Sequence, residues 1–342
     1  MQVTTVGFDL AKHVFQVHGI DDAGQALIRR QIRRSEVLGF FHCLPACLIG
    51  VEACSTAHFW ARELAALGHE VRLMPAAYVK PHVKRSKSDA RDAEGICEAV
   101  TRPTMRFVAI KNPEQQAALT LHRTRDLLVR QRTMLVNALR GHLAEYGIIS
   151  PQGLPSVPKL IEVAEKARGA ALPDLAWRCI RLILAQIEDV HGRIGQVEHE
   201  ILAWHRTNEL SQRLETIPGI ELITASALAA TIPDPSSFRS GQHLAAWIGL
   251  VPRQSGTGGK VRLGHISKQG DRYPRRLLVL GASTLMRHAR GRSSVTAGWI
   301  SALLARRPAS VVKTTIANQL ARIAWAVLQD SEGYRAPAAA AA

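Results

Sequence analysis

The sequence contains no apolar run of the roughly eighteen residues that a membrane-spanning helix requires. It also does not open with the basic and then apolar stretch that is typical of a secretory signal peptide. These two absences predict a cytoplasmic protein with no membrane partner.

Cysteine and aromatic residues are also scarce. The five cysteines include no Cys-x-x-Cys pair, which argues against a zinc site and a disulfide framework and favours buried free thiols. Aromatic residues make up 5% of the chain, and the six tryptophans fall in helical patterns that are typical of core residues. We therefore do not expect the tryptophans to form a platform for stacking bases.

Acidic residues are outnumbered by basic ones. The chain has 44 Lys and Arg against 28 Asp and Glu, a formal net charge of +16. The basic excess is concentrated in residues 80–91, 121–142 and 253–276. Nucleic acid is the partner that this charge distribution predicts.

The first hundred residues alternate between apolar strand patterns and helical patterns. Strands are expected at 3–10, 13–20, 25–33, 48–52 and 71–74, and helices at 35–44, at 56–67 and from Pro75 onward. This order of elements is that of an α/β ribonuclease-H-like fold. In that fold, carboxylates from the first strand, the fourth strand and a late helix converge on one edge of the sheet.

Four carboxylates occupy those positions. Asp9 lies near the end of the first strand, and Glu52 ends the fourth. Asp89 and Asp92 lie at i and i+3 in the first turn of a helix if Ser88 caps it. Such a set could hold two Mg²⁺ ions. Acidic residues at a helix N-terminus are also commonly just solvated, but the joint placement favours a metal site.

Basic side chains surround this acidic pair and could hold a phosphate backbone: Lys84, Arg85, Lys87 and Arg91. A long helix expected at 113–146 carries further cations, including Arg123 and Arg130. These could lie along nucleic acid, or they could simply keep the helix soluble, and the sequence favours neither reading.

Apolar residues alternate at spacings of three and four along a second long helical segment: Ile180, Ile183, Ile187, Val190, Ile194, Val197, Ile201 and Trp204. This pattern is a coiled-coil seam. Its partner helix could come from another subunit or from the 113–146 helix of the same chain. We favour an oligomerising arm.

The C-terminal third is expected to be mainly helical, with helices at about 273–290, 295–306 and 309–329. Residues 214–230 read as two helices joined by a turn like that of a helix-hairpin-helix, although Glu221 favours a merely structural turn. Between 253 and 272 the sequence is rich in glycine and predicts a mobile, phosphate-seeking loop with these cations: Arg253, Lys260, Arg262, Lys268 and Arg272. Ser255 in this loop could be a nucleophile, but serines in glycine-rich segments mostly make turns.

Several motifs together resemble the transposases of the IS110 family, in its IS1111 subgroup. They are V-G-F-D-L-A-K, V-E-A-C-S, K-S-D-A-R-D-A, I-P-G-I, W-I-G-L-V-P-R-Q-S-G-T-G-G-K and I-S-K-Q-G-D-R-Y-P-R-R-L, in the family's order over nearly the whole chain. The resemblance implies a RuvC-like DEDD domain whose metal ligands are Asp9, Glu52, Asp89 and Asp92. It further implies a C-terminal domain whose catalytic serine is Ser255, with Ser267 as the fallback because this chain has only Gln254 between Pro-Arg and the first serine.

The resemblance also implies a mechanism and partners. Ser255 would attack a DNA phosphate with Mg²⁺ at the carboxylates, forming a phosphoserine intermediate during excision and integration of the element. An element-encoded non-coding RNA would select the target and donor DNA. The subunits would form dimers that pair into tetramers, and the serine could complete its site in cis or across subunits.

We therefore predict three regions: a RuvC-like domain at 1–150, a helical coiled-coil arm at 151–212 and a mainly α C-terminal domain at 213–335. Two alternatives remain open. The first is a RuvC-like Mg²⁺-dependent nuclease or junction resolvase, in which water attacks and no covalent protein–DNA adduct forms. The second is a non-catalytic nucleic-acid-binding protein, in which the carboxylates only order local structure.

Overall fold

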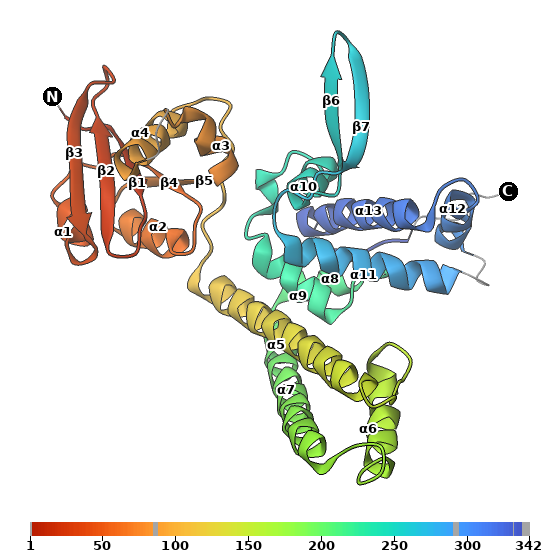
Figure 1. The fold of residues 1–342 in the computed structure, drawn as a ribbon. Helices are drawn as coiled ribbons and strands as arrows, with labels where there is room; N and C mark the ends of the chain where they lie inside the picture. Colours follow the sequence, from red (N-terminus) through yellow and green to blue (C-terminus); the bar gives the residue numbers. More distant parts are fainter. Residues whose placement is uncertain (1, 85–87, 290–293, 331, 337–342) are drawn as a thin grey trace. The chain divides into compact units, whose positions relative to one another are not determined.

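The computed structural model describes residues 2–84, 88–289, 294–330 and 332–336, and its ribbon is drawn in Figure 1. The chain forms two compact units. The first comprises residues 1–115 with 232–237, and the second comprises 116–231 with 238–342. The three functional regions 1–150, 151–212 and 213–335 stay a prediction, because units of packing need not coincide with units of function.

The first unit is built on a five-stranded mixed sheet with the order β3-β2-β1-β4-β5. Its strands are β1 (Thr5–Asp9), β2 (Val14–Ile20), β3 (Ala26–Arg33), β4 (Leu48–Glu52) and β5 (Glu70–Met74). The first three form the predicted antiparallel meander, while β4 pairs parallel to β1 and β5 parallel to β4. The mixed α/β prediction is confirmed, and the assignment to the RuvC-like family of folds stays a prediction.

Helices cover both faces of this sheet. On one face, Phe8 and Phe15 of the sheet pack edge to face at 5.4 Å between ring centroids. Helices α1 (Val37–His42) and α2 (Ala57–Ala66) close this face with Phe41 and Trp60. The opposite face carries α4 (Asp89–Val100), which follows the short helix α3 (Ala76–Val79). Side chains alternate between faces along a strand, so Gly7, the neighbour of Phe8, lies under α4.

Two long helices and a short one open the second unit: α5 (Pro113–Ala144), α6 (Val157–Lys166) and α7 (Asp174–Thr207). Trp177 and Ile180 of α7 share one core cluster with Leu139 and Leu143 of α5. An ion pair of 2.7 Å also joins Arg125 of α5 to Glu198 of α7. The predicted seam thus has a partner helix within its own chain, and oligomerisation through a coiled-coil arm stays a prediction.

The remaining helices form a bundle: α8 (Glu209–Glu215), α9 (Leu222–Thr231), α10 (Gly241–Ile248), α11 (Arg272–Ala289), α12 (Val295–Leu304) and α13 (Ala309–Gln329). The turn between α8 and α9 has a positive φ of 85° at Gly219. A Cβ atom on Gly281 of α11 would come within 2.0 Å of the Gly219 carbonyl oxygen. Backbone contact this close gives the turn a structural role, in line with the reading that the sequence favours.

The expectation of an irregular loop at 253–272 is wrong for most of that segment. The chain forms an antiparallel hairpin of β6 (Pro252–Thr257) and β7 (Lys260–Ile266), which projects from the bundle in Figure 1. Its two-residue turn has φ values of 57° at Gly258 and 77° at Gly259. Two positive φ angles in a row suit the twist of a hairpin, and only glycine adopts them without strain.

The expectation of buried thiols holds for two of the five cysteines. Cys47 and Cys97 are buried and Cys43, Cys54 and Cys179 are exposed, all five without a disulfide. Burial raises the pKa of Cys47 to about 11 and that of Cys97 to about 12.

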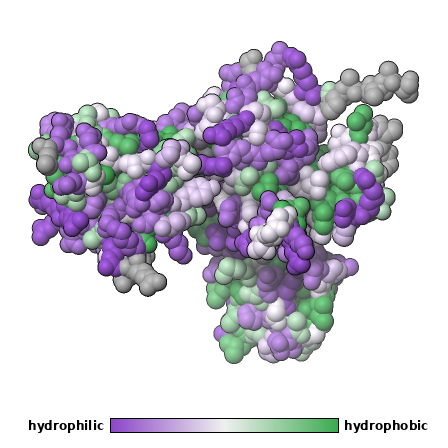
Figure 2. Space-filling model, turned by 90° about the horizontal axis from the view of Figure 1, so that it is seen from above, coloured by the Kyte–Doolittle hydropathy of each residue, from purple (hydrophilic) through white to green (hydrophobic). Residues whose placement is uncertain are grey.

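In the described part of the chain, no helix is long and apolar enough to cross a membrane. Hydrophilic residues cover most of the surface that Figure 2 shows.

A buried histidine in the second unit makes its stability depend on pH. His122 is 1% exposed, and its Nδ1 lies 3.1 Å from the Tyr273 hydroxyl oxygen. Burial, and then the charge of Arg125, lower the His122 pKa to about 4 from 6.5. The unfolded chain therefore binds more protons below pH 6.5, and the stability present above that pH falls as the pH drops towards 4.

We expect His122 to lower the free energy of unfolding by about 3 kcal/mol when the pH falls from 7 to 4. Urea unfolding of the whole chain at both pH values measures it. The double variant His122→Phe with Tyr273→Phe removes the titrating group and its partner together, so its pH dependence should be smaller by that amount. Equal pH dependence in the two proteins would contradict the assignment.

Candidate metal centre and nucleophile

Two of the predicted carboxylates end neighbouring parallel strands. Phe8 of β1 is in register with Val51 of β4, so Asp9 and Glu52 follow at the same edge of the sheet. They also lie on the same face, because each stands two residues after a glycine that faces α4. The strand pairing therefore directs both carboxylates towards the side that α4 covers.

Glycines in the sheet let α4 approach at backbone distance. A Cβ on Gly7 would lie 2.1 Å from the Ala93 carbonyl oxygen, and a Cβ on Gly50 would lie 2.7 Å from Cβ of Val100. Both distances are shorter than any normal contact, so only glycine fits at these positions. The two contacts fix where α4 lies on the sheet, and with it the position of the helix's first turn.

That first turn brings two more carboxylates to the strand end. Asp89 and Asp92 both lie in it, and carboxylate oxygens of Asp9, Asp89 and Asp92 all lie within 4.8 Å of one another. Glu52 is half-buried at the end of β4 and is not part of this group. The structure thus brings three of the four predicted carboxylates together.

The donor set suits a hard divalent cation. Three carboxylates supply only oxygen atoms, which Mg²⁺ prefers over nitrogen or sulfur ligands. The positive end of the α4 helix dipole offsets only part of their mutual repulsion. A bound cation would offset the rest, so the residues present fit the metal that the sequence predicts.

Basic residues near the acidic group are partly engaged with other side chains. Lys84 forms a 2.7 Å ion pair with Glu94 of α4, which lowers the Glu94 pKa and raises the Lys84 pKa. Arg91 is exposed, and the predicted phosphate contacts Arg85 and Lys87 lie outside the described residues. Ser88 occupies the predicted N-cap position with extended backbone, but its side chain makes no capping hydrogen bond.

Packing of α4 on Gly7 is expected to be essential for this centre. Gly7→Ala would force the helix away from the sheet, and we expect it to lower the free energy of unfolding by about 3 kcal/mol or more. Urea unfolding measures the change. Gly39→Ala is the matched control, since a Cβ there meets nothing within 4 Å, and it should leave stability unchanged or raise it. Equal losses in the two variants would contradict this role of Gly7.

The predicted nucleophile stands on the hairpin. Ser255 of β6 pairs with Arg262 of β7, and Thr257 pairs with Lys260 beside the turn. Alternation along the strands places these four side chains on one face of the hairpin and Val261 and Leu263 on the other. All six are exposed. A phosphate that approaches Ser255 on this face would meet Arg262 on the partner strand.

The fallback Ser267 lies after the hairpin in a constrained turn. Its backbone N–H donates to the Val251 carbonyl oxygen at 2.8 Å, and its hydroxyl oxygen accepts from the Gln269 N–H at 3.5 Å. Arg253 donates to the Ser267 carbonyl oxygen at 3.4 Å. This local bonding makes Ser267 a turn residue, and Ser255 the better placed of the two hydroxyls.

The other predicted phosphate contacts are exposed cations of the second unit. On the hairpin segment these are Arg253, Lys260, Arg262, Lys268 and Arg272. On α5, Arg123 is exposed, and Arg130 is exposed with a 3.4 Å ion pair to Asp126. Their role in nucleic-acid binding stays a prediction.

The sequence reading missed a basic strand in the first unit. Strand β3 forms one edge of the sheet, and four arginines lie in it or directly after it: Arg29, Arg30, Arg33 and Arg34. The repeated pair in R-R-Q-I-R-R was the available signal. This six-residue run is short and lies within a strand pattern, so it is less conspicuous than the longer basic segments of the chain.

Comparison with known families accounts for both ends of the chain. Residues 6–148 match a transposase family model named for the DEDD transposases of IS110, and residues 211–296 match the transposase IS116/IS110/IS902 family. A probable family 20 transposase of Pseudomonas aeruginosa is 46% identical over 98% of this chain and 99% of that protein. The transposase of insertion sequence element IS1328 from Yersinia enterocolitica is 40% identical over 95% of this chain and 96% of that protein. The transposase of IS1111A from Coxiella burnetii is 35% identical over 97% and 92%, respectively.

Proposed function

The chain belongs to the IS116/IS110/IS902 family of transposases, and on that premise we propose that it cuts and rejoins DNA through a serine and a Mg²⁺-binding carboxylate centre. Family membership makes it an enzyme of DNA transposition. The observation that carries the finer proposal is the group formed by Asp9, Asp89 and Asp92, with oxygens within 4.8 Å.

The residues of the two proposed centres, the carboxylates of the first unit and the hairpin of the second, have separate roles. Asp9, Asp89 and Asp92, with Glu52 beside them, would hold Mg²⁺. Bound there, the metal supplies positive charge that stabilises the attacking and leaving oxygens of phosphoryl transfer. Arg262 and Lys260, on the same hairpin face as Ser255, hold the non-bridging phosphate oxygens.

The proposed chemistry conserves the phosphodiester energy. The Ser255 hydroxyl gives its proton to solvent, and its oxygen forms a bond to phosphorus as the bond from phosphorus to the leaving strand's oxygen breaks. The leaving oxygen takes a proton from solvent, so that strand departs with a free hydroxyl. Rejoining reverses the step, since a strand hydroxyl attacks the phosphoserine and releases Ser255. A covalent intermediate thus permits strand exchange without an external energy source.

Partners follow from the same proposal. The cationic surface supports binding of both the DNA and a guide RNA, so that base pairing rather than protein side chains selects the sequence. Each of the two long helices exposes a pair of apolar side chains seven residues apart. On α5, Leu127 is 48% and Met134 69% exposed. On α7, Leu175 is 70% and Leu182 69% exposed. Such residues support assembly of dimers into tetramers.

The test is a covalent adduct. Purified protein is incubated with Mg²⁺, the element's junction DNA and RNA from its flanking region, and the DNA is then analysed under denaturing conditions. We expect a protease-sensitive adduct that resists SDS and is lost when EDTA removes the metal. Cleavage with no adduct would overturn the serine mechanism and support the metal-dependent nuclease. Binding without cleavage under any metal condition would support the non-catalytic alternative.

A further inference from the structure

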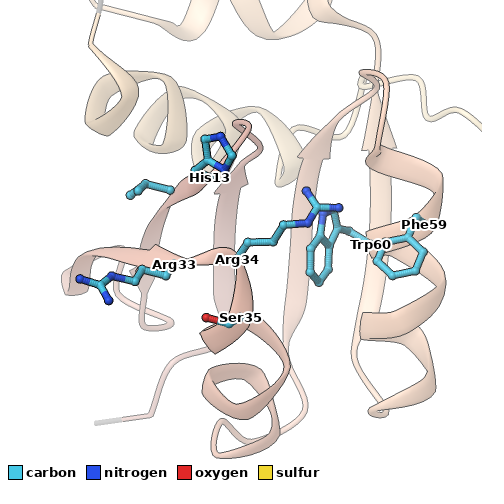
Figure 3. A pocket seen from close by; sticks show the side chains of 7 residues that line it. His13, Arg33, Arg34, Ser35, Phe59 and Trp60 are labelled. Atoms are coloured by element: carbon cyan, nitrogen blue, oxygen red, sulfur yellow. The ribbon is translucent and has the colours of Figure 1, made fainter.

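A pocket of about 620 Å³ opens on the first unit, near the start of β2 and the end of β3. It is lined by His13, Val14, Arg33, Arg34, Ser35, Phe59 and Trp60. Figure 3 shows Arg34 reaching towards the Trp60 ring, while Arg33 extends away from it and Phe59 lies on α2 beside Trp60. The sequence motifs assign no function to these residues, and the proposed chemistry does not use them.

The pocket has an aromatic wall. Trp60 is 4% exposed, and Phe59 beside it is 43% exposed, with 5.1 Å between their ring centroids. The Arg34 guanidinium lies over the indole, 5.2 Å from its centroid. Trp60 is therefore held from behind as a core residue, and Phe59 presents its ring to a ligand.

The rim of the pocket is cationic. Arg33, the last residue of the basic edge strand β3, and Arg34 directly after it are both exposed. Among the described residues, no acidic side chain lines the cavity. The nearby carboxylate of Glu36 is already bonded to the Arg33 backbone N–H at 2.7 Å. An apolar floor with a cationic rim matches a ligand that has a flat ring at one end and a negative charge at the other.

We propose that this pocket binds one unpaired nucleotide of a nucleic-acid strand, with its base against Phe59 and its phosphate at Arg33. The volume suits a single nucleotide, and stacking on a phenylalanine ring accepts any base. The inference takes only the nucleic-acid partner from the family and is independent of the carboxylates and Ser255. The strand could belong to DNA or to RNA, since both present the same base and phosphate chemistry.

The position of the pocket relates it to the acidic centre of the same unit. Asp9 of β1 pairs with Gln16 of β2, and Val14, two residues earlier on β2, pairs with Arg33. The pocket thus lies at the same end of the sheet as the acidic centre. Its aromatic wall belongs to the face that α1 and α2 cover, whereas Val14 and Arg33 lie on the face of Asp9. A strand that rounds this end could reach both places, and the pocket would hold it in register.

Photo-crosslinking of the full chain tests the proposal locally. Oligonucleotides that contain 5-iodouracil, one of RNA and one of DNA, are irradiated with the protein, and the tryptic peptides are mapped by mass spectrometry. We expect adducts on the peptide of residues 35–62, which contains Phe59. The stronger of the two signals identifies the source of the strand. Adducts only on other peptides, with both oligonucleotides, would overturn the proposal.

Variants then separate stacking from structure. Phe59→Ala should weaken binding of a polyuridine or polythymidine strand about tenfold while leaving binding of an abasic strand unchanged. Arg33→Gln should weaken binding of both the base-containing and the abasic strand. It should also reduce the slope of log K against log salt concentration by about one. Phe107→Ala is the matched control, because that ring is also exposed, at 37%, but lies outside the pocket. It should change neither affinity.

Two outcomes of these measurements would contradict the inference. Equal weakening of the base-containing and abasic strands by Phe59→Ala would mean that the ring supports the fold and does not stack. If Phe59→Ala changed neither the crosslinking to the 35–62 peptide nor the affinity, the strand would bind outside this pocket.

Discussion

Replacement of Ser255 by alanine is expected to abolish the covalent protein–DNA adduct and, with it, strand rejoining. Alanine removes the only atom that can form the bond to phosphorus, while the exposed position on β6 makes the variant neutral for folding. Without the nucleophile we expect a loss of more than about a thousandfold in the rate of adduct formation. Quantification of SDS-resistant complexes on labelled junction DNA measures it.

Thr257→Ala provides the matched control. Thr257 carries a hydroxyl on the same face of the same strand, two residues from Ser255 and equally open to solvent. It should retain the adduct at the level of the unmodified protein. If Ser255→Ala kept the adduct and Ser267→Ala lost it, the nucleophile would be the serine in the turn, and the hairpin would serve only to bind DNA.

Asp92→Asn is expected to remove nearly all strand cleavage. The substitution keeps the size of the side chain and the first turn of α4, but takes one negative charge from the group of three. Loss of a metal-ligand charge typically costs about 4 kcal/mol of transition-state stabilisation, which corresponds to roughly a thousandfold in rate. Single-turnover cleavage at saturating protein measures this loss.

Stability measurements distinguish loss of metal from loss of fold. Three carboxylates within 4.8 Å repel one another, so Asp92→Asn should leave the metal-free protein as stable as before or more so. Added Mg²⁺ should raise the Tm of the unmodified protein and have little effect on the variant. Glu98→Gln is the control on the same helix, since Glu98 is paired with Arg102 and His82, and it should cleave normally. A Tm lowered by Asp92→Asn without metal would indicate a structural role instead.

Much of the first unit could be predicted because its signals are local. Apolar runs mark the strands, and two carboxylates at strand ends with two more at a helix start suffice to indicate a shared edge. The close packing of α4 could not be foreseen, since Gly7 and Gly50 look like ordinary strand glycines until the helix that crosses them is known. The position of Glu52 outside the group within 4.8 Å likewise depends on tertiary geometry.

One element was predicted wrongly and one was left open. Five glycines and five cations suggest an irregular loop at 253–272, although Gly258-Gly259 between short alternating runs is also the signature of a two-residue hairpin. The heptads of α7 left open whether their partner helix comes from another subunit or from the same chain, and α5 of the same chain packs against their first part. Periodicity shows that a helix needs a partner, and it does not show which helix that partner is.

The exposed hairpin has a kinetic consequence. Every residue of β6 is exposed, and β7 is exposed up to its last residue, so the pair has no core of its own beyond the base that packs near Gly249 and Gly270. An isolated two-stranded ribbon is marginally stable in water. Its amide hydrogens should therefore exchange with deuterated solvent far sooner than those of α9, whose residues from Thr224 to Thr231 are buried. The strand that carries Ser255 would then spend part of its time unpaired until a ligand holds it. Substrate binding would in that case also fix the nucleophile in its place.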